Sequence, residues 1–297
     1  MRTVTDVLRE QVESFLLDAK TLFANYSVYV PHQPQYYSDT VYFVHMGTHY
    51  WGKLDVEGQR IASKLRVGYQ RFADVLGVLL NAQDGSTIQQ LKHGRYRVRQ
   101  FIDQEGEHSY INGEAAYEGF KTEIYEQLGL LEKLHDGKEG EHIYVPDTNA
   151  LIYNPRFDEW IFNESPIFTL VMMPTVLGEL DKHKVNDRNQ AVRDKAKQVI
   201  SQVKDYRRRG NLAEGVTIRK GKISLRTTAV EPNFENTLSW LDKDNNDDRI
   251  LAGFIEIMRQ HIRCPVILVT ADINLMNKAD FAGLPCIEPP DQTSGSA

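Results

Sequence analysis

The sequence predicts an α/β fold: a three-layer α/β/α domain with a central parallel sheet over residues 141–290, preceded by a mostly helical α+β domain over residues 1–140. Two observations predict this division. From residue 143 onward, short apolar runs alternate with amphipathic stretches, which is typical of consecutive βαβ units. Before residue 135, most apolar residues recur at steps of three and four, which is the helical period.

The first domain is predicted to contain three amphipathic helices, over residues 3–24, 57–81 and 115–135. Between Tyr26 and Trp51, six tyrosines accompany alternating apolar residues, so one or two strands are expected there. Such aromatic residues can stack unpaired bases, although strand packing explains them without a ligand. A metal site is disfavoured in this stretch because its histidines are irregularly spaced and no Cys or acid completes a ligand set; they are His32, His45 and His49.

Residues 134–142 carry glycines and charges without apolar periodicity, so they are predicted to link the two domains. Beyond them, strands are expected over residues 143–145, 167–173 and 265–270. Helices are expected between them, around residues 175–184, 188–206 and 247–261. Residues 216–225 predict a hairpin that turns at Lys220 and Gly221, and residues 291–297 a disordered tail.

Composition excludes several classes of protein. The chain has 297 residues and a net charge of −6, and its longest apolar runs are far shorter than the roughly 20 residues that a membrane-spanning helix needs. No membrane partner is therefore expected. The two cysteines, Cys264 and Cys286, cannot form a disulfide framework, and the first residues lack a signal-peptide pattern, so the expected location is the cytoplasm. Whether the chain forms a homo-oligomer is left open.

Acidic residues follow the predicted strands of the second domain. Asp147 and Asp272 come directly after strands, Glu179 lies in the first turns of a helix that follows a strand, and Asp247 and Asp248 open another helix. Each alone is well explained as a helix cap or a first-turn acid. Together at one sheet edge, carboxylates about 5 Å apart would repel by about 3 kcal/mol per pair. A hard divalent cation, Mg²⁺ or Mn²⁺, would relieve this repulsion, and protonation is the competing relief.

Four sequence blocks resemble the PIN domain nuclease family, and all four occur in the family's order. They are DTNALI at residues 147–152, MPTVLGELDKHK at 173–184, NDDRILA at 246–252 and LVTADINL at 268–275. The resemblance covers about residues 143–288 and is nearest to the PIN modules of PhoH-like ATPases and of eukaryotic RNA-decay factors. No family is identified in the amino-terminal domain.

The resemblance implies one or two Mg²⁺ or Mn²⁺ ions and in-line hydrolysis of phosphodiesters. It assigns the catalytic and metal-binding positions to Asp147, Glu179, Asp247 and Asp272. Asp247 is preferred to Asp248 by its spacing from Ile250, and Asp248 is expected to reach a metal through water. Supporting roles are assigned to Asn149 and Thr270, which would orient a carboxylate or a water, and to Thr148, for which packing is the favoured role.

A basic stretch lies between Lys182 and Arg226, with fourteen basic residues against four acidic ones. Its net charge of +10 leaves −16 for the rest of the chain. A solvated helix face would explain any single charge here, but the excess favours a track for a phosphate backbone beside the cleavage site. The candidate nucleic-acid-binding residues are Lys182, Lys184, Arg188, Arg207, Arg208, Arg209, Arg219, Lys220 and Lys222.

The sequence therefore predicts a metal-dependent nuclease, expected to be an endoribonuclease acting on single-stranded RNA, with single-stranded DNA as the other candidate partner. Two alternatives stay open. One is a PIN protein that binds nucleic acid without cutting it, which the complete set of acids disfavours. The other is a toxin ribonuclease of a toxin–antitoxin pair, which the length of the chain disfavours.

Overall fold

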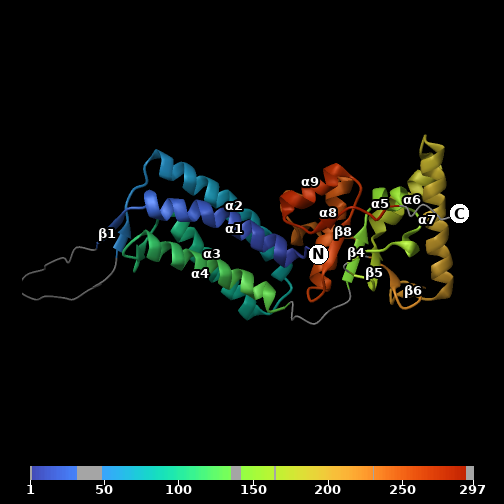
Figure 1. Cartoon of the computed structure of the whole chain (residues 1–297), viewed down its shortest axis with the longest axis horizontal. Helices are drawn as coiled ribbons and strands as arrows, with labels where there is room; N and C mark the ends of the chain where they lie inside the picture. Colours follow the sequence, from blue (N-terminus) through green and yellow to red (C-terminus); the bar gives the residue numbers. More distant parts are fainter. Residues whose placement is uncertain (1, 32–48, 135–141, 164, 230, 292–297) are drawn as a thin grey trace, which may run out of the picture. The chain divides into compact units, whose positions relative to one another are not determined.

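The computed structural model describes residues 2–31, 49–134, 142–163, 165–229 and 231–291 (Figure 1). These residues form two compact units. One consists of residues 8–133, and the other combines the described residues after 133 with residues 2–7. No helix within the described ranges is both long and apolar enough to cross a membrane.

The first unit is mainly helical, as predicted. Its helices are α1 (Val4–Asn25), α2 (Val56–Leu80), α3 (Gly85–Asp103) and α4 (Gly113–Glu132), and a small antiparallel sheet has the strand order β1-β2-β3, from β1 (Tyr29–Pro31), β2 (His49–Trp51) and β3 (Glu107–His108). Side-chain caps begin three of the helices: Asp55 at α2, Asp84 at α3 and Asn112 at α4 each accept a backbone N–H. Most of the predicted aromatic stretch, including His32 and His45, lies outside the described residues.

Helix α3 is an element of this unit that was not predicted from the sequence. Its buried residues follow the helical period of three and four but are few: Leu91, Gly94, Val98, Phe101 and Ile102. Polar and charged residues occupy most of the other positions, so the apolar stripe is narrow. The helix forms because this narrow stripe packs against α2 and α4.

The second unit is an α/β sheet structure. Its six strands, in the order β6-β7-β5-β4-β8-β9, are all paired in parallel except β6 with β7. Strands β5 and β8 are buried along their whole length and β4 beyond its first residue, which means that both faces of the sheet are covered. The strands are β4 (His142–Pro146), β5 (Phe168–Met172), β6 (Val216–Arg219), β7 (Ile223–Thr227), β8 (Val266–Val269) and β9 (Cys286–Ile287).

Five α-helices belong to this sheet: α5 (Thr148–Tyr153), α6 (Pro174–Asn186), α7 (Gln190–Arg209), α8 (Asn246–Gln260) and α9 (Ile273–Ala282), with short 3₁₀ turns at Phe157–Glu159 and Phe234–Asn236. The predicted strands and helices after residue 143 are confirmed. Residues 135–141 and 292–297 lie outside the described residues, so the exact domain boundary and the disordered tail stay predictions.

Strand order decides which loops meet at the carboxyl edge of the sheet. Strand β4 lies between β5 and β8, and its last residue, Pro146, is in register with Val269 at the end of β8. The chain leaves β4 into α5, β5 into α6 and β8 into α9. Because parallel strands end at the same edge, the starts of these three helices are brought together there.

The predicted hairpin is present, with Gly221 at the turn in the left-handed region (φ +67°). Its second strand, β7, pairs in parallel with β5, with Ile223 opposite Phe168. The turn between Arg219 and Lys222 therefore lies at the amino ends of the parallel strands, which is the edge away from the helix starts.

We expect Ile267→Ala, in β8, to lower the free energy of unfolding of this unit by about 2–5 kcal/mol, because it would leave a cavity at a fully buried position. The matched control is Ile167→Ala, where the side chain is 62% exposed; the expected loss there is within about 0.5 kcal/mol. Urea unfolding of the full chain measures both, and equal losses would contradict the central placement of β8.

Candidate active site

Asp147 is the most deeply buried acid of the carboxyl edge, with 1% of its surface exposed. It is the N-cap of α5, where its Oδ1 accepts the backbone N–H of Ala150 at 2.7 Å. Its Oδ2 accepts the hydroxyl of Thr270, at the end of β8, at 2.5 Å. Both carboxylate oxygens are thus held by elements that start or end at this edge.

Burial raises the pKa of Asp147 to about 7. Desolvation is the main cause, and the hydrogen bonds from Thr270 and Ala150 oppose it by favouring the charged form. The negative charges of Asp272 and Glu179 raise the pKa further. Asp147 is therefore close enough to both acids to feel their charges.

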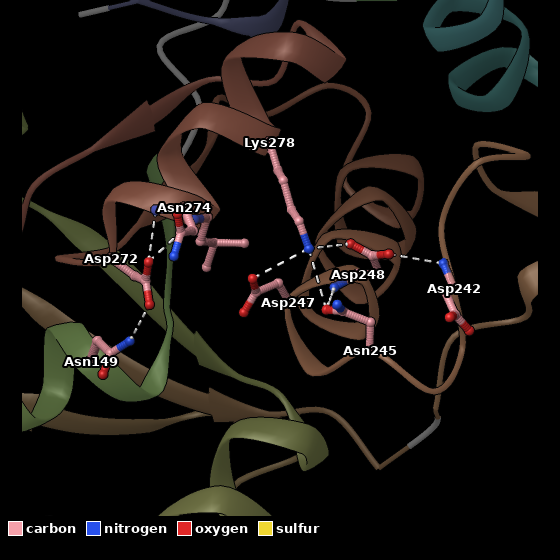
Figure 2. Close-up of polar contacts among 9 residues, drawn as sticks. Asn149, Asp242, Asn245, Asp247, Asp248, Asp272, Asn274 and Lys278 are labelled. Carbon is pink, nitrogen blue, oxygen red and sulfur yellow. Dashed lines mark hydrogen bonds and ion pairs between the residues drawn. The ribbon is translucent and has the colours of Figure 1, made fainter.

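Asp272 is the N-cap of α9 and is held on three sides. Its Oδ1 accepts the N–H of Asn274 at 2.8 Å, and its Oδ2 accepts the side-chain amide of Asn149 at 2.9 Å (Figure 2). Its own N–H donates to the hydroxyl oxygen of Thr270 at 2.9 Å. Thr270 thus links the backbone of Asp272 to the carboxylate of Asp147.

Glu179 approaches from α6, and its Oε2 accepts the hydroxyl of Thr148. Thr148 is itself buried in the first turn of α5. Its predicted packing role is therefore accompanied by a polar one, because its hydroxyl holds a carboxylate. Each of the three predicted supporting residues, Thr148, Asn149 and Thr270, contacts one of the predicted acids.

Asp247 and Asp248 form a second group, at the start of α8 (Figure 2). Both pair with Lys278 of α9: its Nζ lies 2.7 Å from Asp248 Oδ1 and 3.3 Å from Asp247 Oδ2. Asp248 is also fixed on its other oxygen, which accepts the N–H of Asp242 at 3.0 Å. The predicted water-mediated metal contact of Asp248 stays a prediction, since this carboxylate already has protein partners on both oxygens.

Lys278 is the site residue that sequence reasoning missed. A lone lysine on a short amphipathic helix has the appearance of an ordinary solvated charge. Its contacts with the two carboxylates join residues about thirty positions apart on different helices, so they depend on the tertiary fold.

The donor chemistry of the first group suits a hard divalent cation. Asp147, Glu179 and Asp272 offer carboxylate oxygens, each fixed by a neighbouring hydroxyl or amide, and Mg²⁺ and Mn²⁺ prefer oxygen ligands. Within the described residues, however, no three His, Cys, Asp or Glu side chains are grouped tightly enough to hold a metal ion as they stand. The three carboxylates are therefore neighbours around Asp147 and not a closed coordination cage.

The basic residues do not all lie at the carboxyl edge of the sheet. Lys182 and Lys184 lie on α6, the helix that carries Glu179. Arg207 lines a groove with Thr227 at the carboxyl end of β7. By contrast, Arg219, Lys220 and Lys222 surround the hairpin turn at the opposite edge.

The prediction that the whole basic stretch lies beside the acids is thus wrong for the hairpin residues. The reason is the parallel pairing of β7 with β5, which sends the turn to the amino ends of the strands. Two further members are engaged locally: Arg208 pairs with Asp205 at 2.9 Å, and Arg209 lies over the ring of Tyr206. Arg188 is exposed after the end of α6.

The raised pKa of Asp147 has a consequence for stability. Without metal, the folded state binds this proton more tightly than the unfolded state does, so the free energy of unfolding should fall as pH rises from about 4 to about 7. The loss is at most about 4 kcal/mol, since one pKa unit is worth about 1.4 kcal/mol.

Urea unfolding in chelator across this pH range measures the effect. Asp147→Asn should remove the contribution of Asp147 to the pH dependence of the free energy of unfolding. Thr270→Val should shift that contribution to higher pH, because the substitution removes a hydrogen bond that favours the charged form of Asp147. Thr270→Ser keeps the hydroxyl and serves as the control. An identical slope in wild type and Asp147→Asn would contradict the assignment.

Comparison with protein families identifies the second unit. Residues 144–289 match the sequence model of the family described as PIN domain. No curated protein matches the chain. The matched range contains all four sequence blocks that resemble the PIN family. It begins within β4 and extends past the end of β9. Residues 144–289 are therefore a PIN domain, the fold of a family of metal-dependent nucleases.

Proposed function

We propose that this chain is an Mg²⁺- or Mn²⁺-dependent endoribonuclease that cuts single-stranded RNA at the carboxyl edge of its PIN domain sheet. The observation that carries the proposal is the gathering of Asp147, Glu179 and Asp272 at that edge, with Asp147 influenced by the charges of the other two. Such a group of neighbouring carboxylates is costly without a cation, and a nuclease has a use for that cation.

Asp147, Glu179 and Asp272 would hold the ion. When bound, it would activate water and offset the negative charge that develops on the scissile phosphate. The chain's own residues prepare for this: Thr270, Thr148 and Asn149 orient the three carboxylates by hydrogen bonds to their oxygens. A cation beside Asp147 also favours its ionised form, so proton and ion compete for the same carboxylate.

A groove on the same unit offers a path for the strand. It has a volume of about 470 Å³ and lies between α6, the second half of α7 and the segment that leads into β6. Leu177, Ile200 and Val203 give it an apolar floor, and Lys204 and Arg207 stand exposed at its rim. Apolar surface beside cations suits unpaired bases next to their phosphates, which favours a single strand over a duplex.

The expected surroundings are a reducing cytoplasm. Cys264 and Cys286 are both thiols, and burial raises the pKa of Cys286 to about 12, which keeps it protonated and unreactive.

Asp147→Asn and Asp272→Asn should each lower Mn²⁺-dependent RNA cleavage by more than about 100-fold, because loss even of residues that only orient metal ligands costs about 10–100-fold. RNA affinity measured in chelator should stay nearly unchanged, since neither acid is expected to hold the strand. Labelled single-stranded RNA, single-stranded DNA and duplexes, each with Mg²⁺, Mn²⁺ and chelator, are the substrates. Wild-type activity in either variant, or cleavage that survives chelator, would refute the proposal.

The double variant Lys204→Glu with Arg207→Glu should weaken RNA binding. It should also reduce the slope of the logarithm of the binding constant against the logarithm of the salt concentration by about 1.4, because each phosphate of a single strand that a cation neutralises contributes about 0.7 to that slope. The matched control is Lys220→Glu with Lys222→Glu, the same change in charge at the opposite edge of the sheet. Fluorescence anisotropy with a short oligonucleotide at several salt concentrations measures both. Equal effects of the two double variants would contradict a track along the groove.

A further inference from the structure

Lys278 lies among three oxygen atoms that belong to the start of α8. Its Nζ is 2.7 Å from Asp248 Oδ1, 3.3 Å from Asp247 Oδ2 and 3.3 Å from Asn245 Oδ1. Asn245 is the N-cap of α8, and the two acids follow in its first turn (Figure 2). One ammonium group thus bridges the whole polar start of this helix.

This contact is partly shielded from water. The side chains of Lys278 and Asp248 are 29% and 9% exposed, so the pair is screened less than an ordinary surface ion pair. Partial desolvation lowers the pKa of Lys278, but the hydrogen bonds and charges of Asp248 and Asp247 outweigh it and raise the pKa overall. Both carboxylates therefore favour the charged form of the lysine.

The three oxygens are also the donor types that a hard divalent cation uses: two carboxylates and a side-chain amide carbonyl. With Lys278 present, the two acids and the lysine together carry a charge of −1. Without it they would carry −2, on neighbouring residues at the end of one helix. The lysine thus neutralises part of this negative charge, as a bound cation would.

We propose that Lys278 is a built-in cation that takes the place of a second divalent ion, so that this PIN domain binds one metal ion, on Asp147, Glu179 and Asp272, and not two. This inference rests on the proposed function, because it assumes that the first group of acids binds metal. It gives Asp247 and Asp248 a different role from that of direct ligands: they hold the lysine at the site, and Asp242 in turn holds Asp248 through its N–H.

The test is a count of bound Mn²⁺ in the full-length protein by isothermal titration, with free Mn²⁺ measured independently by electron paramagnetic resonance. We expect one ion in wild type and two in Lys278→Met, since the two carboxylates, no longer paired with an ammonium group, would then bind an ion. Lys278→Arg keeps the positive charge and should bind one. The matched control is Lys243→Met, an exposed lysine in the loop before α8, which should also bind one.

A further variant guards against misfolding of Lys278→Met. The double variant Asp247→Asn with Lys278→Met removes one of the two repelling charges, should fold readily, and should bind one ion again. Two ions in wild type, or one in a folded Lys278→Met, would overturn this inference and leave the proposed nuclease function standing. No ion in any of the proteins would overturn both.

Discussion

The hydrogen bond from Thr270 to the buried carboxylate of Asp147 is the contact on which the active edge depends. Asp147 has almost no contact with water, so its charge must be stabilised by protein groups. Thr270 can reach it because Pro146 and Val269 are in register, which places the residues after β4 and β8 opposite each other. The same hydroxyl accepts the N–H of Asp272. A shift in this register would therefore move Asp147 away from Asp272. It would also break the hydrogen bond between Thr270 and Asp147.

The two groups of acids resolve the same electrostatic problem differently. Around Asp147 the charges of Asp272 and Glu179 add to the desolvation that raises its pKa to about 7. At the start of α8 the repulsion is relieved by Lys278, which is covalently part of the chain. Under our proposal, the first group binds a divalent ion, whereas the second group, already paired with Lys278, does not. Under the proposed function, the metal ion would therefore bind to the carboxylates nearest the strand ends.

Much of this edge could be predicted from the sequence because its signals are local. Strands that are buried on both faces appear in the sequence as runs of apolar residues, and Asp147 and Asp272 follow such runs closely. Asn149 and Thr270 lie two residues from Asp147 and Asp272, but each donates a side-chain hydrogen bond to the carboxylate of the other acid, so these contacts depend on the pairing of β4 with β8. The contacts of Lys278 could not be predicted, because they depend on the tertiary fold. The same limit applies to the hairpin: its turn is encoded locally at Gly221, but pairing of β7 with β5 joins residues more than fifty positions apart.

The proposed function requires a chain with a net charge of −6 to bind a polyanion, and this depends on where its charges lie. Interactions between exposed charges are screened over about 8 Å at physiological ionic strength, so local charge matters more than the total. A five-residue strand such as β7 spans about 16 Å at about 3.3 Å per residue. Lys220 and Lys222 are therefore about two screening lengths from the carboxyl edge and add little to the potential there. Under the proposed function, a cation placed near that edge, such as Arg207 beside Thr227 at the end of β7, therefore contributes more to attracting a phosphate there.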